Sequence, residues 1–298
     1  MRLRFGIVAA QARPFAELLS DWQYIESLGF DNAWLIDHFA PAFAPKAPWL
    51  ESWTTLAALA ARTERIRLGT AVTNAAVRNP GVLCKQAITV DQISGGRLEM
   101  AIGAGYYEEE QRMLGIDYPD AKGRAERLRE VVQVLDKGLR GETVSLAGDH
   151  WRLDGLPMGP GPVQLPRPPI WVAAQSTFSL RTAAQYADVL VTMGDVGDQP
   201  VATLPKLLRR FERLGDICSE LGRDPKTMRR AYLVGWADDR PFDSDQAFTD
   251  FVGSFAEAGV TDFMFGLSSA RATLERVAAS LEPLSASFDQ ISARPPGF

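Results

Sequence analysis

The segment that decides the fold is "IRLGTAVTNAAVRNPGVLCKQAITVDQISGGRLEMAIGAG", residues 66–105. It begins with an apolar run rich in β-branched residues at 66–73 and ends with a second apolar run at 98–104. A helical pattern lies between the two runs and begins at Pro80, and proline is typical of the first turn of a helix. Two parallel strands joined by a helix form a βαβ unit.

The same alternation of strand and helix recurs along the whole chain. We expect strands at 3–10, 32–37, 66–73, 98–104, 170–174, 188–193, 228–236 and 262–267. We expect helices at 15–28, 54–64, 80–93, 121–140, 177–186, 201–221, 244–258 and 271–283. Strands that are apolar on both sides are typical of a parallel sheet with covered faces. Eight such units predict an α/β fold, the (β/α)8 TIM barrel. A doubly wound open sheet is the alternative that this pattern leaves open.

Two long segments interrupt the alternation. Residues 38–53 follow the second strand and contain Pro41, Pro45 and Pro48. Residues 141–169 separate the fourth helix from the fifth strand, and their "PGPVQLPRPP" excludes a helix. We interpret the second segment as an insertion in the barrel. Because no domain linker is evident, we expect residues 1–298 to form a single domain.

Composition narrows the possible partners. The 32 basic and 37 acidic residues leave a net charge of −5, which argues against nucleic acid as a partner. Cys84 and Cys218 are too few for a disulfide framework. No apolar run approaches the roughly 18 residues that a membrane span needs. We interpret "MRLRFGIVAAQA" as a first buried strand and expect a cytoplasmic protein with no membrane partner.

Active sites of such barrels lie at the carboxyl ends of the strands. In chain order, the polar or small residues at these ends are Asp37-His38, Ala71 to Asn74, "GAGYYEEE" (103–110), Ala173 to Ser176, Thr192 to Asp195, Trp236 with Asp238 and Asp239, and Ser268, Ser269 and Arg271. His38 is one of only two histidines, and histidine can exchange a proton near neutral pH. The adjacent Asp37 favours a charged imidazole, although neighbours on an extended chain point apart. Position alone leaves a catalytic and a structural role for His38 equally open.

The other motifs at the strand ends indicate a function less strongly. Glu108 to Glu110 suit a helix start, where carboxylates oppose the positive end of the helix dipole. "GAG" lacks the third glycine of a dinucleotide loop but permits close backbone approach to a planar ligand. Ser176 is a helix cap beside amides that suit an anion such as a cofactor phosphate. No metal-ligand spacing and no G-x-S-x-G motif is present, and His150 in "GDHWRL" is expected to be structural.

Two further function classes remain open at this point. Glycosidases of this fold carry paired carboxylates at the mouth of the barrel. The acidic residues Glu108 to Glu110 and Asp238-Asp239 therefore leave a TIM-barrel glycoside hydrolase as a remote alternative. A non-catalytic barrel that binds a ligand or a partner is the other.

Several segments together resemble the bacterial-luciferase-like flavin and deazaflavin oxidoreductases. They are "DHF", "ESW", "TERIRLGTAVT", "RNPGVLCKQAITVDQISGGRLEMAIGAGYYEEEQRMLGI", "VQLPRPPIWVAAQS" and "RTAAQYADVLVTM". The similarity is strong over roughly residues 1–195 and loose beyond. The family fold is a (β/α)8 barrel, so the resemblance implies one luciferase-like domain over residues 1–298.

The resemblance also implies a cofactor, the deazaflavin coenzyme F420 or FMN, across the carboxyl-end mouth. His38 matches a position with a proton-transfer role, and Glu110 matches the acidic residue after "GAG", so both are the expected catalytic residues. "GTAV" matches a bulge with a non-prolyl cis peptide, here Ala71–Val72, behind the ring. The expected cofactor-binding residues are Asp37, Ala71, Val72, Thr73, Gly103, Gly105, Ala173, Ala174, Gln175, Ser176, Thr192 and Met193. Many family members have glycine in place of Gln175.

"DHF" and "GAGYYEEEQRMLGI" are most similar to the F420-using branch. That branch implies hydride transfer between F420 and a small organic substrate, and homodimers are common in the family. The alternative is an FMN-dependent two-component monooxygenase, which needs a separate flavin reductase as partner. The sugar-phosphate branch has a tryptophan after the histidine and basic residues near strand six. Here "FAPAF" follows His38, and Asp195 and Asp198 follow strand six, so a phosphorylated sugar is not expected. Phe39, Phe43, Trp49 and Trp53 are candidates for an apolar lid, with packing in the core as the equal alternative for each.

Overall fold

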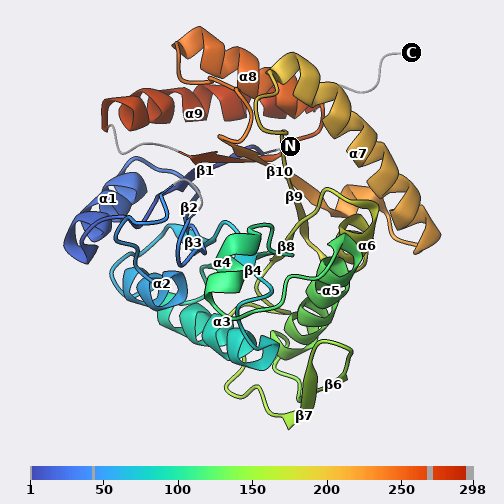
Figure 1. The fold of residues 1–298 in the computed structure, drawn as a ribbon. Coiled ribbons are helices and arrows are strands. Elements are labelled where there is room, and N and C mark those ends of the chain that lie inside the picture. The colour runs from blue at the N-terminus through green and yellow to red at the C-terminus, as the bar shows by residue number, and fades with distance from the viewer. Residues whose placement is uncertain (1, 42–43, 267–270, 293–298) are drawn as a thin grey trace.

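The computed structural model describes residues 2–41, 44–266 and 271–292 and shows a closed barrel (Figure 1). The barrel strands, all parallel, are β1 (Arg4–Val8), β2 (Asn32–Leu35), β3 (Arg67–Thr70), β5 (Leu98–Gly103), β8 (Ile170–Ala173), β9 (Val189–Met193), β10 (Arg229–Val234) and β11 (Asp262–Gly266). Pairing between β3 and β5 closes the ring that otherwise runs from β3 through β2, β1, β11, β10, β9 and β8 to β5. The predicted (β/α)8 barrel is confirmed, and the open-sheet alternative is wrong.

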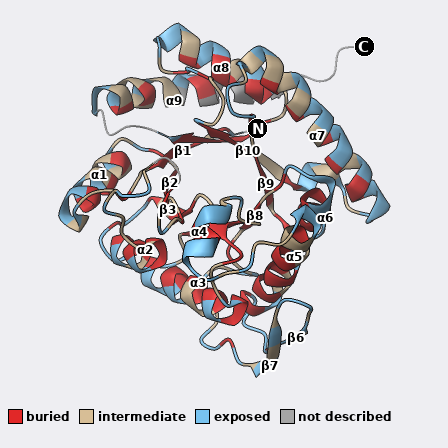
Figure 2. Ribbon diagram, viewed as in Figure 1, coloured by how far each residue is buried: buried red, intermediate tan, exposed pale blue. Residues whose placement is uncertain are grey.

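Helices surround this ring, as Figure 1 shows. They are α1 (Phe15–Ser27), α2 (Ser52–Ala60), α3 (Pro80–Ser94), α5 (Ala121–Gly138), α6 (Thr177–Tyr186), α7 (Pro200–Glu220), α8 (Asp245–Glu257) and α9 (Arg271–Ser292). The start of α3 is set by Asn79, whose side chain accepts hydrogen bonds from the amides of Gly81 and Val82. Figure 2 shows the buried residues on the helix faces that meet the strands, so the main core is the layer between the strands and the helices.

The interior of the barrel is filled by side chains. Trp34 of β2 and Trp171 of β8 are fully buried and meet edge to face, with ring centroids 4.9 Å apart. The rest of this inner cluster is Val8, Ala101, Val189, Val191, Ala231, Leu233 and Met264. A filled interior leaves the rims of the barrel as the places where a ligand can bind.

Three features differ from the expected element boundaries. The strand expected at 66–73 is interrupted at Ala71–Val72, where the peptide bond is cis, and it resumes as β4 (Thr73–Asn74), which pairs with β5. An additional helix, α4 (Glu108–Met113), follows β5 and lies within the outline of the ring in Figure 1. A short 3-10 turn, Pro225–Thr227, precedes β10.

The insertion between α5 and β8 contains an antiparallel hairpin of β6 (Val144–Ala147) and β7 (Arg152–Leu156). Glu130 of α5 holds its turn, because its buried carboxylate accepts hydrogen bonds from the amides of Asp149, His150 and Trp151. His150 thus lies in a structural turn, away from the carboxyl ends of the strands, as the sequence predicts.

Candidate active site

His38 and Glu110 form a hydrogen-bonded pair at the carboxyl-end rim. His38 Nδ1 lies 3.0 Å from Glu110 Oε2, and the two side chains are 11% and 1% exposed. The amides of Phe39 and Ala40 donate to the other oxygen of Glu110 at 2.7 and 3.0 Å. Burial alone raises the pKa of Glu110, but the hydrogen bonds from His38 and these amides outweigh it. The pKa therefore lies below its ordinary value, and the carboxylate is ionised at neutral pH.

Tyr106 covers the other side of the His38 ring. Its hydroxyl lies 3.3 Å from His38 Nε2, and the two rings meet edge to face at 5.7 Å. Trp236, just past β10, packs against the same tyrosine ring at 5.1 Å. Burial, together with the nearby Glu110 and Tyr107, raises the pKa of Tyr106 to about 12. The phenol is therefore protonated at neutral pH.

Asp37 does not contact His38, although the two are adjacent in sequence. Its buried carboxylate accepts hydrogen bonds from Arg78 at 2.6 and 2.8 Å, from the amide of Asn74 at 3.0 Å and from the Ser52 hydroxyl. Because these contacts occupy both carboxylate oxygens, Asp37 ties the end of β2 to β4 and to the start of α2. The carboxylate that contacts the imidazole is Glu110, and the adjacent Asp37 binds other partners, as expected for neighbours that point apart on an extended chain.

Small and apolar residues form a floor beside the histidine. Ala71, Val72, Ala173 and Met193 are partly buried and pack on the inner cluster of the barrel. Gly103 brings the strand ends close together, since a Cβ there would lie 2.8 Å from Val72 Cγ2 and 3.4 Å from Ala173 Cβ. The small residues at the ends of β4, β5 and β8 therefore lie close together, and a surface of small side chains suits a planar ring.

A buried donor without a partner lies beside this floor. Gly105 adopts a φ of +79°, and a Cβ at that position would lie 2.3 Å from Asn74 Oδ1 and 2.9 Å from Gln111 Nε2. Gln111 is fully buried, and Arg127 holds its Oε1 at 2.9 Å. Within the described residues its Nε2 has no hydrogen-bond partner. Burying an unsatisfied amide is costly, and a polar ligand beside Gly105 would satisfy it.

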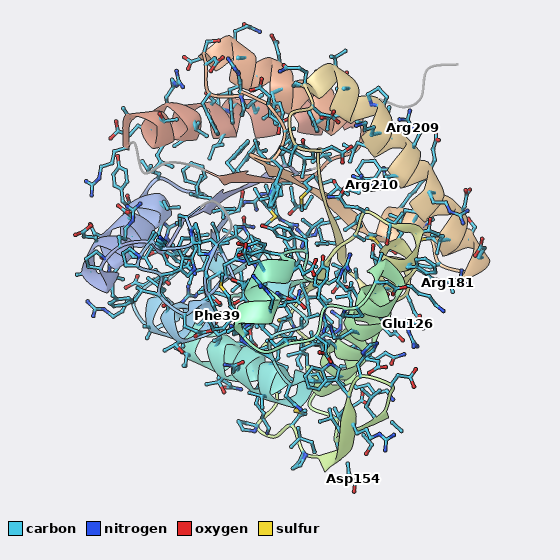
Figure 3. All side chains as sticks on the ribbon, in the orientation of Figure 1. Phe39, Glu126, Asp154, Arg181, Arg209 and Arg210 are labelled. Carbon is cyan, nitrogen blue, oxygen red and sulfur yellow. The ribbon has the colours of Figure 1, made fainter. Side chains whose placement is uncertain are left out.

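The ends of β8 and β9 carry the side expected to bind a phosphate. Ser176 caps α6, and its hydroxyl accepts a hydrogen bond from the amide of Ser179 at 3.3 Å. Arg210 of α7 donates to Gln175 Oε1 at 3.0 Å and to the Met193 carbonyl at 3.3 Å. Figure 3 marks Arg210 on the side of α7 that faces the barrel. The sequence pattern did not point to Arg210, because it lies within a long amphipathic helix.

The other expected residues take supporting positions. Thr73, Thr192 and Ala174 are buried, and the hydroxyl of Thr192 donates to the Ala231 carbonyl at 3.0 Å. Of the lid candidates, Phe39 is 39% exposed beside α4, whereas Trp53 is 2% exposed and takes the alternative position in the outer core. Phe43, Ser268 and Ser269 lie outside the described residues.

The carboxylates expected of a glycosidase have separate partners. Glu110 contacts His38, Asp239 accepts a hydrogen bond from Tyr232 at 3.2 Å, and Asp238 pairs with Arg240 at 2.6 Å. In the ranges that the structure describes, no group of histidine, cysteine, aspartate and glutamate side chains is arranged to hold a metal ion. Nor is any helix there long and apolar enough to cross a membrane.

Known proteins resemble this chain in sequence and in fold. The chain is 31% identical over 229 residues to an F420-dependent glucose-6-phosphate dehydrogenase of Microbacterium testaceum, a match that covers 74% of this chain and 64% of that protein. It is 31% identical over 234 residues to the oxygenase component of a flavin-dependent trigonelline monooxygenase of Acinetobacter baylyi, with 77% and 62% covered. The match thus spans a little under two thirds of each of these relatives.

A solved structure supports the same assignment of fold. The F420-dependent secondary alcohol dehydrogenase in complex with an F420–acetone adduct superposes with a TM-score of 0.79 at 20% identity, covering 96% of this chain and 99% of that one. A model of the luciferase-like monooxygenase family matches residues 3–234. Enzymes that use F420 and enzymes that use a flavin both occur among the relatives. The chain belongs to the luciferase-like monooxygenase family.

Proposed function

We propose that this protein transfers a hydride between F420 and a small organic substrate, and that His38 gives or takes the accompanying proton. The observation that carries the proposal is the pair of His38 and ionised Glu110, 3.0 Å apart, at the rim beside the apolar floor. When bound, the cofactor supplies the hydride chemistry. The protein's own task is to hold the two reactants, orient them and move one proton.

The residues present fit a cofactor of this kind. Ala71, Val72, Gly103 and Ala173 would support its ring, because they form the floor without bulky side chains. The free amide of Gln111 offers a hydrogen bond beside Gly105. On the phosphate side, Ser176 at the start of α6 and the guanidinium of Arg210 would hold the anionic part of the cofactor.

The pair of His38 and Glu110 suits proton exchange. A carboxylate can only accept hydrogen bonds, so Nδ1 of His38 carries the hydrogen that lies toward Glu110. Nε2 is then the acceptor in the neutral ring and the atom that gains the proton. The imidazolium that results stays in hydrogen-bond contact with the ionised Glu110.

The surroundings of the histidine support an uncharged substrate. Phe39, Tyr106 and Trp236 give the rim an aromatic character. Lys206, near the end of β9, is paired with Asp195 at 2.7 Å and with Asp198 at 2.6 Å. A cation that is already neutralised by two carboxylates is a poor ligand for a substrate phosphate. We therefore propose secondary alcohols and the corresponding ketones as the first substrates to test, and not a phosphorylated sugar.

A cofactor titration tests this proposal. The seven tryptophans provide a fluorescence signal that a bound ring would quench. Titration with F420 is expected to show binding with a Kd of about 1 µM or below, roughly 8 kcal/mol of binding free energy. FMN, titrated in parallel, is expected to bind more weakly. Clear FMN binding without F420 binding would contradict the proposal.

The second candidate is an FMN-dependent two-component monooxygenase. The similarity to the oxygenase component of a trigonelline monooxygenase favours it. Such an enzyme would need reduced FMN from a separate flavin reductase, and it would consume O₂ in the presence of its substrate. Oxygen uptake measured with reduced FMN, with and without each candidate substrate, separates this function from F420-dependent hydride transfer.

A further inference from the structure

We propose that Tyr106 is a second proton-transfer residue, whose hydroxyl completes a relay from Glu110 through His38 to the substrate oxygen. The inference rests on the proposed function, because the proton in question is the one that leaves or joins that oxygen. It assigns a role to a residue that the sequence analysis placed only within the segment 103–110 at the end of a strand.

The relay is visible as an unbroken row of polar contacts. Glu110 Oε2 lies 3.0 Å from His38 Nδ1, and His38 Nε2 lies 3.3 Å from the hydroxyl of Tyr106. Because Nδ1 donates to the carboxylate, Nε2 of the neutral ring can only accept. The hydroxyl of Tyr106 is therefore the donor. A distance of 3.3 Å is long for such a bond, but catalytic hydrogen bonds are commonly long without substrate and tighten in the complex.

Tyr106 also lies where a substrate would arrive first. The tyrosine is 50% exposed, whereas the side chain of His38 is 11% exposed. Its ring is held edge to face between His38 and Trp236, and its carbonyl accepts a hydrogen bond from the Tyr118 hydroxyl at 2.8 Å. A substrate oxygen that enters the mouth would thus meet the phenol before the imidazole.

The proton steps balance. In alcohol oxidation, the substrate O–H bond breaks and its proton binds the Tyr106 oxygen while the original phenol proton moves to His38 Nε2. His38 ends as an imidazolium beside the ionised Glu110, and the substrate oxygen becomes that of a carbonyl. The hydride lost from the carbinol carbon goes to an oxidised deazaflavin, which is the oxidant. Carbonyl reduction reverses each step. The raised pKa of Tyr106 agrees with this role, because the phenol keeps its proton until it is passed on.

Nitrogen NMR of histidine tests the hydrogen bond without any cofactor. The chain has only two histidines, so ¹⁵N-histidine labelling of the His150→Gln protein leaves the signals of His38 alone. Tyr106→Phe removes only the hydroxyl. The ¹⁵N chemical shift of His38 Nε2 is expected to move toward that of an imidazole nitrogen that accepts no hydrogen bond. Tyr107→Phe is the matched control, since the Tyr107 hydroxyl donates to Glu109 at 3.1 Å. It is expected to leave the signal in place.

Kinetics test the transfer itself. F420 reduction is followed with 2-propanol, cyclohexanol and 1-phenylethanol, and the fastest of the three is used for all variants. Tyr106→Phe is expected to lower kcat by about 10²-fold with little change in KM, whereas Tyr107→Phe matches the wild type. The value of kcat is also measured in mixtures of H₂O and D₂O. For the wild type, two protons that move in the same step give a curved dependence of kcat on the D₂O fraction. One proton gives a straight line for Tyr106→Phe.

The outcomes separate this proposal from the proposed function. An unchanged His38 signal in Tyr106→Phe overturns the relay, whatever the activity. A lower kcat with an equally curved dependence on D₂O also overturns it, because Tyr106 would then only shape the mouth. If wild-type protein oxidises none of the three alcohols with F420 while the NMR contact is present, the proposed function fails and the relay loses its reaction.

Discussion

At the scale of single residues, the environment of His38 is set by groups from two parts of the chain. Glu110 of α4 contacts one ring nitrogen, Tyr106 contacts the other, and the backbone around Phe39 and Ala40 donates to Glu110. The histidine is thereby oriented from both sides. An oriented imidazole beside a carboxylate is the arrangement that general acid–base catalysis needs.

Replacing His38 by alanine is expected to lower kcat for F420-dependent turnover by about 10²-fold or more, the size of one general acid–base contribution. The Kd for F420, measured by tryptophan fluorescence, is expected to change little, since the floor of the site is untouched. His150→Gln provides the control, because that residue lies in the hairpin turn. Turnover of the alanine variant equal to that of the wild type would remove His38 from the reaction.

The lowered pKa of Glu110 predicts a pH-dependent contribution to stability. A carboxyl group with a depressed folded-state pKa stabilises the fold at pH values above its ordinary pKa of 4.5. This stability is lost as the pH falls through the folded-state pKa. The Tm difference between wild type and Glu110→Gln is therefore expected to be largest near neutral pH and to shrink below about pH 4.5. Exposed Glu109→Gln is the control. A difference that grows with acidity would refute the assignment.

Gly105 allows a test of the space beside Gln111. Gly105→Ala combines a positive φ of +79° with a Cβ only 2.3 Å from Asn74 Oδ1. Gly115→Ala has a similar φ of +69° but no atom within 4 Å of the added Cβ, so it measures the backbone cost alone, about 1–2 kcal/mol. Urea unfolding is expected to show the larger loss for Gly105→Ala, and F420 titration a weaker Kd for that variant only. If the two substitutions change the stability and the Kd equally, the cofactor does not need the space beside Gln111.

At the scale of elements, the ion pair between Asp37 and Arg78 holds the mouth together. The guanidinium, 8% exposed, also contacts Glu51, the cap of α2, at 2.5 Å, and lies 5.5 Å from the Phe39 ring. Through Asp37 it reaches the amide of Asn74 in β4. One guanidinium therefore joins the end of β2, the strand after the cis peptide and the start of α2.

Removing this guanidinium is expected to be costly. Arg78→Ala leaves the buried Asp37 carboxylate without its ion-pair partner, and breaking a buried ion pair costs about 3–5 kcal/mol. Urea unfolding measures this loss, and the Kd for F420 is expected to rise as well, because β4 would lose its anchor. Arg112→Ala breaks an exposed pair with Glu109 and is expected to cost at most about 1 kcal/mol. Comparable losses in the two variants would show that the buried pair is not the anchor.

At the scale of the whole molecule, the sequence predicted which residues lie at the strand ends. It predicted only some of the contacts between those residues. Buried parallel strands leave short apolar runs bounded by polar residues, which is why the barrel and the position of His38 could be predicted. The partner of Asp37 could not, since Arg78 lies 41 residues further along the chain. The contact of Tyr106 with His38 could not be predicted either. Two tyrosines follow "GAG", and the sequence does not show which of them faces His38.

The most direct test of the account follows a hydride from substrate to cofactor. Wild-type protein is incubated with F420 and with 2-propanol, cyclohexanol or 1-phenylethanol carrying deuterium on the carbinol carbon, and the reduced cofactor is examined by mass spectrometry. For at least one alcohol, the reduced F420 is expected to carry one deuterium, formed about 10²-fold more slowly in His38→Ala. Cofactor that is reduced without deuterium, or that no alcohol reduces, would contradict it.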